Sequence, residues 1–258
     1  MVKLVKRLIR NQLNRFGFDF IKIRYDPNAK NIPNDIEDSV RAIIKRVMTY
    51  TMTSAERISS LYQAIQYITI NKIEGAIVEC GVWKGGSMMA AMLVLVENKA
   101  LDREFYLYDT YEGMSAPTEF DKAHTGQTAA EQMAKADRLD QESIWCLSTL
   151  DEVQKNIAST GYPAARIKYI KGMVQDSIPA TLPGKIALLR LDTDFYESTL
   201  HELKHLFPLL VKGGVLIIDD YGHWQGARKA VDEYIAENKV KILLNRIDYS
   251  GRLAVKIE

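Results

Sequence analysis

The sequence predicts an α/β fold with a seven-stranded, mostly parallel sheet, N-terminal helices and an antiparallel last strand. Two observations lead to this prediction. Segments 186–191 and 215–218 are almost continuously apolar and flank a helix-like segment, as neighbouring parallel strands buried on both faces do. Each segment ends in two acids, Asp192 and Asp194 after the first and Asp219 and Asp220 after the second. The carboxyl ends of the strands form the ligand crevice of an open sheet, so chemistry is expected there.

Length and composition favour one large domain and argue against several classes of protein. With 258 residues the chain is long enough for a single domain over residues 36–258, behind an extension over residues 1–35. A formal net charge of +1 argues against a nucleic-acid partner, because such binders present a strongly basic face. Two cysteines are too few for a disulfide framework, and no apolar stretch approaches the ~20 residues that span a bilayer. We therefore expect a cytoplasmic protein without a transmembrane segment.

The first two dozen residues are basic and amphipathic, with Asp19 as their one acid. A helix of this kind packs on the domain or on a second copy of the chain, or it rests weakly on an anionic membrane surface. Further helices are predicted over residues 36–50 and after Thr53, where Thr53 and Glu56 have the spacing of a capping box. Their apolar stripes exceed what the sheet is expected to cover. A homodimer is therefore predicted.

The remaining elements alternate as this fold requires. A strand over 76–79 leads through a glycine-rich turn to a helix over 88–96, and a second strand covers 104–109. Residues 111–140 have little apolar periodicity, which predicts a lid or a binding loop. The elements that follow are a helix over 150–159, strands over 166–171, 186–191 and 215–218, helices over 196–211 and 228–237, and a hairpin over 240–247 and 252–257. Gly213 and Gly214 are expected to close the helix over 196–211.

The turn after the first strand is a candidate cofactor site. Gly81, Gly85 and Gly86 allow a ligand to approach the backbone closely, although their spacing departs from the dinucleotide fingerprint and also suits a tight helix-packing turn. Glu79 beside the turn disfavours a pyrophosphate but suits a positively charged ligand such as S-adenosylmethionine. Asp109 ends the second strand, where an acid either accepts the ribose hydroxyls of an adenosine or caps a turn.

An adenine is expected next to the residues that follow the third strand, by topology alone. These residues are Gly172, Met173, Gln175 and Asp176.

Asp192, Asp219 and Asp220 are candidate ligands of a metal ion. One aspartate after a strand is ordinarily a solvated helix cap, but capping needs one acid per helix and leaves the others without a partner. Crowded carboxylates resist burial unless a cation lies among them. Oxygen ligands suit Mg²⁺ better than zinc.

Four motifs resemble the macrocin O-methyltransferase family, the TylF-like enzymes of antibiotic biosynthesis. They are residues 79–87 (ECGVWKGGS), 106–114 (YLYDTYEGM), 189–194 (LRLDTD) and 214–222 (GVLIIDDYG). The resemblance covers the chain from about Thr53 onwards. It implies a class I methyltransferase (Rossmann-like) fold, S-adenosylmethionine as methyl donor, and Mg²⁺ held by Asp192, Asp219 and Asp220.

The same resemblance assigns roles to individual residues. Asp194 matches the acid proposed as general base in relatives. His223 is not assigned by the resemblance, but it follows Asp220 by three residues and is therefore expected to contact the acceptor or to serve as an alternative base. Positions around the donor are matched by Glu79, Gly81, Ser87 and Asp109, and Thr53, Gly85, Gly172, Met173, Gln175 and Asp176 complete the donor-site candidates. Relatives in this family are often dimers.

The leading hypothesis is a Mg²⁺-dependent O-methyltransferase acting on a sugar hydroxyl of a small-molecule acceptor. Chelation by a cation lowers the high pKa of such a hydroxyl, and a nearby carboxylate then takes the proton. A catechol-type methyltransferase uses the same metal chemistry on adjacent phenol oxygens and stays an alternative. A non-catalytic binding module with this fold is a third hypothesis, which the intact aspartates disfavour. An NAD-dependent oxidoreductase is disfavoured by the broken fingerprint.

Overall fold

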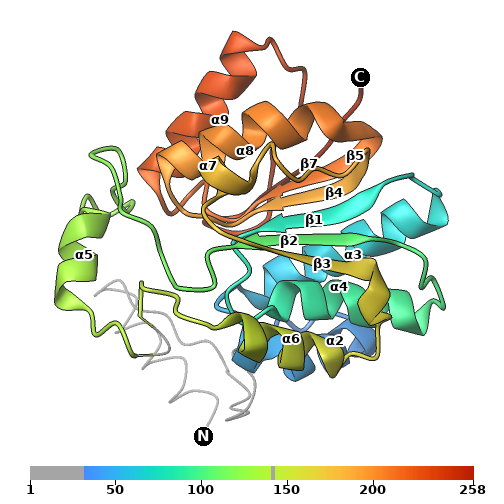
Figure 1. Ribbon diagram of the computed structural model, residues 1–258. Helices are drawn as coiled ribbons and strands as arrows, with labels where there is room; N and C mark the ends of the chain where they lie inside the picture. The colour runs from blue at the N-terminus through green and yellow to red at the C-terminus, as the bar shows by residue number, and fades with distance from the viewer. Residues whose placement is uncertain (1–31, 141–142) are drawn as a thin grey trace, which may run out of the picture. The chain divides into compact units, whose positions relative to one another are not determined.

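Seven strands form one sheet in the order β3-β2-β1-β4-β5-β7-β6 (Figure 1). This computed structural model describes residues 32–140 and 143–258, and Ile32–Glu258 form one compact unit. The strands are β1 (Ala76–Cys80), β2 (Phe105–Asp109), β3 (Ile167–Lys171), β4 (Ile186–Leu191), β5 (Leu210–Ile218), β6 (Asn245–Arg246) and β7 (Arg252–Val255). Neighbours from β3 to β5 pair in parallel, whereas β7 pairs antiparallel with β5 and with β6. The predicted sheet and its antiparallel last strand are confirmed.

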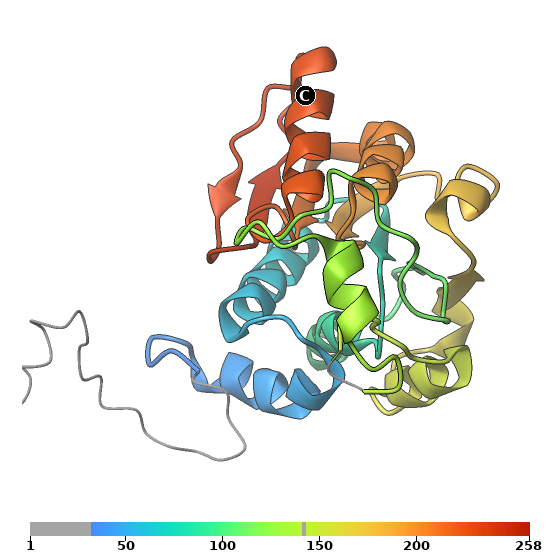
Figure 2. The same ribbon diagram turned by 90° about the vertical axis from the view of Figure 1, so that its left-hand side faces the viewer.

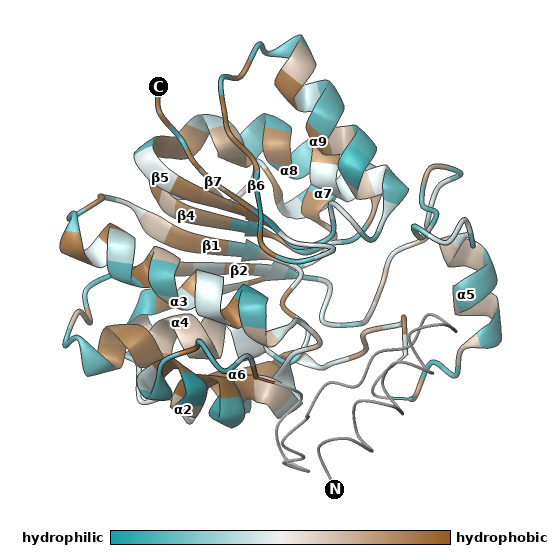
Figure 3. Cartoon of the chain, turned by 180° about the vertical axis from the view of Figure 1, so that it is seen from behind, coloured by the Kyte–Doolittle hydropathy of each residue, from teal (hydrophilic) through white to brown (hydrophobic). Residues whose placement is uncertain are grey.

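Helices cover both faces of the sheet, as Figure 1 and the reverse view in Figure 3 show. One face carries α2 (Asp38–Val47), α3 (Ala55–Ile70), α4 (Gly86–Glu97) and α6 (Leu150–Ala158), and the other carries α7 (Val174–Ser177), α8 (Tyr196–Leu206) and α9 (Gln225–Glu237). Short 3₁₀ helices are η1 (Met48–Tyr50), η2 (Ala164–Arg166) and η3 (Phe207–Leu209). None of the helices in the described ranges has both the length and the apolarity that a membrane crossing requires.

Side-chain alternation along the strands builds a separate core on each face. Ile77 and Leu188 pack with α2, α3 and α4, whereas their neighbours Val78 and Leu189 pack with α8 and α9. Strands that are buried on both faces must therefore be apolar at nearly every position. Figure 3 shows this as hydrophobic strands between amphipathic helices.

The apolar stripes of α2 and α3 are buried within one chain. In α2, Ile43 and Ile44 are 3% and 0% exposed, and in α3, Ile65 and Ile68 are both 0% exposed. The described part of the chain thus covers the stripes that led us to expect a partner. The predicted homodimer stays a prediction. The N-terminal extension that was expected to contribute to it, and to contact a membrane, lies mostly outside the described residues.

Three local predictions were wrong. Ser54, not Thr53, caps α3, because its Oγ accepts a hydrogen bond from the Arg57 amide. Gly213 and Gly214 lie inside β5 instead of closing α8, and of the strand predicted over 240–247 only β6 is paired.

Segment 111–140, predicted as a lid or a binding loop, contains the helix α5 (Ala129–Lys135). Thr128 and Glu131 form a capping box at its start, and it lies across the carboxyl edge of the sheet in the view of Figure 2.

A carboxyl group lies in the core beneath this edge. Glu202 of α8 is 0% exposed, its Oε1 accepts a hydrogen bond of 2.9 Å from the Thr193 hydroxyl, and its Oε2 has no partner among the described residues. Because no cation offsets its burial, desolvation raises the pKa of Glu202 to about 8. Near neutral pH the folded protein therefore holds Glu202 protonated.

This burial predicts a stability that depends on pH. The folded state binds a proton at Glu202 that the unfolded state has released, so Glu202 lowers the free energy of unfolding progressively as pH rises from about 5 to about 8. Glutamine cannot ionise at this position. In Glu202→Gln the free energy of unfolding should therefore lack the decrease with pH, of up to about 1.4 kcal/mol per pH unit, that Glu202 causes in the wild type. Urea denaturation at several pH values measures it, with exposed Glu197→Gln as the control on the same helix. Parallel pH profiles for wild type and Glu202→Gln would contradict the account.

Candidate active site

Sheet register places three charged residues side by side at the carboxyl edge. Glu79 of β1 pairs with Arg190 of β4, and Arg190 pairs with Ile217 of β5. Asp219 follows Ile217 by two residues, and backbone hydrogen bonds extend the ladder to it, since its amide donates to Leu191 at 2.9 Å. Residues two apart on a strand share a face, so all three side chains project toward the layer of α3 and α4. Parallel pairing alone thus gathers these charges.

Arg190 is the buried cation at the centre of this group. Its side chain is 3% exposed and makes three ion pairs: Nη1 lies 2.7 Å from Glu79 Oε1 and 2.6 Å from Asp192 Oδ2, and Nη2 lies 2.6 Å from Asp219 Oδ1. Arg190 was not among the predicted site residues. Its signal was present, because an arginine inside a strand that is otherwise apolar and buried on both faces must find carboxylates nearby.

A second cation reaches the same group from α3. Arg57 Nη1 pairs with Asp219 Oδ2, and its Nε lies 3.0 Å from Asp248 Oδ2 in the loop between β6 and β7. The Thr53 hydroxyl lies 3.3 Å from both oxygens of Asp219. Thr53 therefore contacts a metal-ligand candidate, and its predicted contact with the donor stays a prediction. Asp219 is the most heavily paired acid of the group.

The predicted metal ligands come together. Among the described residues, Asp192, Asp219 and Asp220 each offer an oxygen, and these oxygens lie within 4.8 Å of one another. Asp220 Oδ2 is buried and has no hydrogen-bond partner in the described part of the chain. Burial raises the pKa of Asp192 and Asp220 well above the ordinary value, whereas Arg190 and Arg57 overcome burial at Asp219 and hold its pKa low. An oxygen-only set with an unpartnered buried oxygen fits a divalent cation such as Mg²⁺.

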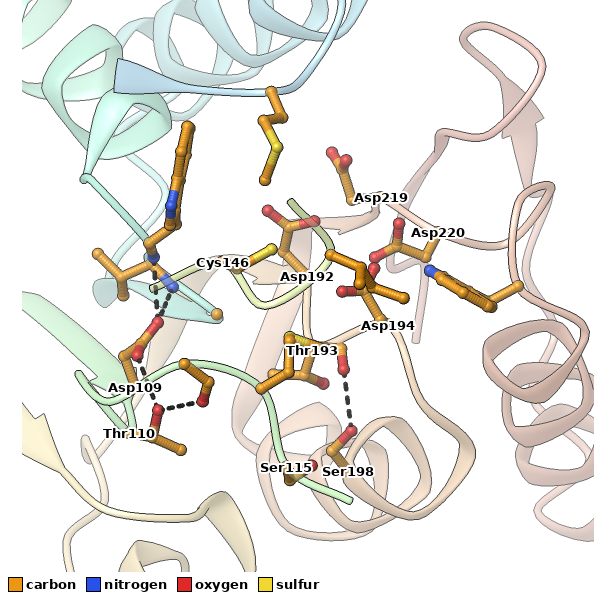
Figure 4. Close-up of a pocket in the computed structure, with 18 of the residues that line it drawn as sticks. Asp109, Thr110, Ser115, Cys146, Asp192, Thr193, Asp194, Ser198, Asp219 and Asp220 are labelled. Carbon is orange, nitrogen blue, oxygen red and sulfur yellow. Dashed lines mark hydrogen bonds between the residues drawn. The ribbon is translucent and has the colours of Figure 1, made fainter. Parts of the chain in front are cut away.

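Asp194 lies beside this set on the turn that follows β4. It adopts a left-handed backbone conformation with φ of 66°, and burial, reinforced by the charge of Asp192, raises its pKa to about 7. Figure 4 shows Asp192, Asp194, Asp219 and Asp220 gathered at one end of a pocket, with Asp109 at the other. A carboxylate with a pKa near neutrality is suited to accept a proton.

The glycine-rich turn is held by Asp109. Its carboxylate accepts hydrogen bonds from the amides of Val82 at 2.6 Å, Trp83 at 3.0 Å and Tyr111 at 2.6 Å. Gly81 has φ of 82°, and a Cβ there would overlap the Asp192 carbonyl oxygen. Asp109 thus shapes the turn, which agrees with the turn-capping alternative. Its predicted contact with a ribose stays a prediction.

The turn and the acids line one cavity of about 450 Å³. Most of the predicted site residues line it: Thr53, Gly81, Ser87, Asp109, Gly172, Met173, Gln175, Asp192, Asp194, Asp219, Asp220 and His223. Glu79 lies beneath the lining at 1% exposure, and its Oε2 has no partner within the described residues. Gly85 faces Ile157 of α6, and Asp176 is exposed outside the lining, so neither is placed as expected.

Aromatic residues form the rim near His223. His223 Nδ1 lies 3.1 Å from the Tyr249 hydroxyl, and burial together with the charge of His124 lowers the pKa of His223. The His124 amide, within segment 111–140, donates to the His223 carbonyl at 2.7 Å. That segment also contributes to a small core, which comprises Ala123, Ala129, Met133, Phe195, Trp224 and Ala227. These contacts hold segment 111–140, the predicted lid, against the rim of the cavity. Its response to ligands stays a prediction.

Comparison with known proteins identifies relatives of this site. Residues 12–254 match the family model described as Macrocin-O-methyltransferase (TylF). The demethyldecarbamoylnovobiocin O-methyltransferase of Streptomyces niveus is 29% identical over 202 residues, which are 78% of this chain and 74% of the relative. The mycinamicin III 3''-O-methyltransferase of Micromonospora griseorubida is 28% identical over 204 residues, 79% of this chain and 77% of the relative.

A solved structure shares the fold. The O-methyltransferase NovP superposes with a TM-score of 0.70 at 26% sequence identity, covering 81% of this chain and 83% of NovP. The seven-stranded sheet is thus that of a class I methyltransferase, as predicted. Because the family model matches residues 12–254, which are nearly the whole chain, the chain belongs to the macrocin O-methyltransferase (TylF) family and is an S-adenosylmethionine-dependent O-methyltransferase.

Proposed function

We propose that this enzyme methylates a hydroxyl of a sugar on a natural product, in the manner of antibiotic biosynthesis, and that Mg²⁺ bound by Asp192, Asp219 and Asp220 is required. The observation that carries the metal proposal is the group of three aspartate oxygens within 4.8 Å, with Asp220 Oδ2 buried and unpartnered among the described residues. The acceptor class follows the relatives. One of them, from Streptomyces olivaceus, is named for 4'-O-methylation of a rhamnosyl tetracenomycin and is 29% identical over 204 residues.

The donor is expected to lie between the glycine-rich turn and the acids. Glu79 Oε2 is buried without a partner in the described structure, so it is available to the positively charged methionine end. Asp109 and Ser87 line the same cavity, where the ribose and the turn amides are expected to meet. These contacts fit a cationic nucleoside better than a pyrophosphate.

Proton removal is assigned to Asp194. When bound, Mg²⁺ supplies the positive charge that lowers the pKa of the acceptor hydroxyl. Asp194, whose pKa burial raises to about 7, is placed beside Asp220 to accept that proton while the oxygen attacks the donor methyl. His223 at the rim contacts the acceptor or replaces Asp194 as base. The cavity walls hold the two reactants together, which supplies much of the remaining rate.

A catechol-type acceptor is the second candidate, because adjacent phenol oxygens suit the same oxygen ligands. The relatives named above favour the sugar hydroxyl. An assay of methyl transfer to sugar-bearing natural products and to catechol, under identical conditions, separates the two. Turnover of catechol alone would overturn the proposed acceptor class.

Metal binding should depend on each aspartate of the set. Asp192→Asn and Asp220→Asn each remove an anionic ligand, so affinity for Mn²⁺, a spectroscopic substitute for Mg²⁺, should fall at least tenfold in electron paramagnetic resonance titrations. Asp176→Asn is the matched control, because Asp176 is exposed and does not line the cavity. Equal Mn²⁺ affinity in all four proteins, or full activity in EDTA, would refute the metal role.

Loss of the base should leave binding intact. Asp194→Asn should lower the rate of methyl transfer by roughly 10²- to 10⁴-fold, the range for losing a general base. Dissociation constants for the donor and for Mn²⁺ should change by less than about threefold. Near-normal turnover by this variant would transfer the role of base to His223.

Donor binding should depend on Asp109. Asp109→Ala removes the acceptor of two amide hydrogen bonds from the glycine-rich turn and of one from Tyr111, and it removes the expected ribose contact. Donor affinity should then fall by about 1.5 to 3 kcal/mol, the usual cost of losing charge-assisted hydrogen bonds. Isothermal titration with S-adenosylmethionine measures this. An unchanged dissociation constant would remove Asp109 from the donor site.

A further inference from the structure

One buried residue joins the two halves of the site, and the chemistry described above gives it no part. We propose that Arg190 is a positioning residue that links two parts of the site. The donor half-site is Glu79 beside the glycine-rich turn, and the metal half-site is Asp192, Asp219 and Asp220. This inference rests on the proposed Mg²⁺ site. The guanidinium of Arg190 touches Glu79 on the donor side and both Asp192 and Asp219 on the metal side. It touches no group that reacts.

The geometry of the guanidinium makes the link direct. A single nitrogen, Nη1, lies 2.7 Å from Glu79 Oε1 and 2.6 Å from Asp192 Oδ2, so one atom donates to both half-sites. An arginine side chain presents its N–H donors in a rigid planar fork, so a displacement that follows one carboxylate alters the contact with the other. Glu79 and Asp192 therefore move together.

Arg190 also determines which oxygens remain for ligands. It engages Oε1 of Glu79, which leaves Oε2 buried and without a partner among the described residues. It engages Oδ2 of Asp192, whose side chain is 28% exposed and lines the cavity, which leaves Oδ1 for the metal. The same contact that directs an oxygen to the donor thus directs one to the metal. Removing contacts that orient metal ligands typically costs 10- to 100-fold in metal affinity.

Arg57 provides a matched comparison within the same cluster. It contacts Asp219 on the metal side and Asp248 in the following loop, and no contact with Glu79 is formed in the described structure. Replacing an arginine on the metal side, such as Arg57, should change the affinity for the metal alone. Replacing an arginine that contacts both sides, as Arg190 does, should change the affinities for the metal and for the donor.

The test measures both affinities in the full-length protein without turnover. Titration with S-adenosylmethionine in chelator gives the donor dissociation constant, and Mn²⁺ titration followed by electron paramagnetic resonance gives that of the metal. Arg190→Met and Arg190→Lys should each weaken donor and Mn²⁺ binding about tenfold or more. Lysine keeps the charge but cannot reproduce the planar fork. Arg57→Lys should weaken Mn²⁺ binding and leave the donor constant within about threefold.

A structural control separates this effect from a general loss of stability. Arg103 donates to the carbonyls of Ile73 at 3.0 Å and Gly75 at 2.6 Å, ahead of β1 at the opposite end of the sheet. Arg103→Met should lower the melting temperature and leave both dissociation constants unchanged. If neither Arg190 variant folds, Glu79→Ala provides the test. It removes a donor-side partner of Arg190 and should still weaken Mn²⁺ binding at least threefold.

Each outcome decides between the alternatives. Wild-type affinities for both ligands in the Arg190 variants, or a change in only one affinity, would overturn the link, as would an unchanged Mn²⁺ constant in Glu79→Ala. Absence of Mn²⁺ binding by the wild-type protein is a different result, because it would refute the proposed metal site before Arg190 is tested.

Discussion

The structure depends on one electrostatic constraint, which is that several carboxylates must lie close together at the edge of a buried parallel sheet. Glu79 and Asp219 are 1% and 3% exposed, and the surroundings are too apolar for either to remain charged alone. Arg190 meets this constraint from inside the sheet, and Arg57 adds a second cation from α3. The strand order β2-β1-β4-β5 is what brings these groups together, because it places the ends of β1, β4 and β5 side by side.

Arg190 and Arg57 do not offset the burial of every acid in the group, and this suits the proposed reaction. Arg190 and Arg57 hold the pKa of Asp219 low, whereas burial and neighbouring acids hold those of Asp220 and Asp194 above the ordinary value. Glu79 and Asp220 each keep one buried oxygen without a hydrogen-bond partner within the described chain. Under the proposed function, two positively charged ligands would complete the site, since the donor carries a sulfonium and an ammonium and the metal would carry two charges. With both ligands bound, Asp194 would be the acid left to accept a proton.

The sequence predicted much of the fold because parallel strands buried on both faces are apolar and end at one edge. The same argument grouped Asp192, Asp219 and Asp220 at that edge. Partnerships between distant segments could not be predicted in this way. Arg190 looked like an interruption of an apolar strand because its three partners lie on β1, after β4 and after β5. A helix of seven residues gives little periodic signal, so α5 was not predicted within segment 111–140. Thr53 had the spacing of a cap, but its hydroxyl is engaged by Asp219 and Ser54 caps the helix.

The most direct measurement is a crystal structure of the enzyme with Mn²⁺ and S-adenosylhomocysteine, with the metal located by anomalous scattering. The account predicts an anomalous peak about 2.1 Å from one oxygen each of Asp192, Asp219 and Asp220, the distance expected for a hard cation of this size. It also predicts the amino group of the ligand beside Glu79, with Arg190 still bridging Glu79 and Asp192. A metal bound elsewhere, or an Arg190 side chain that leaves Glu79 when both ligands are present, would contradict it.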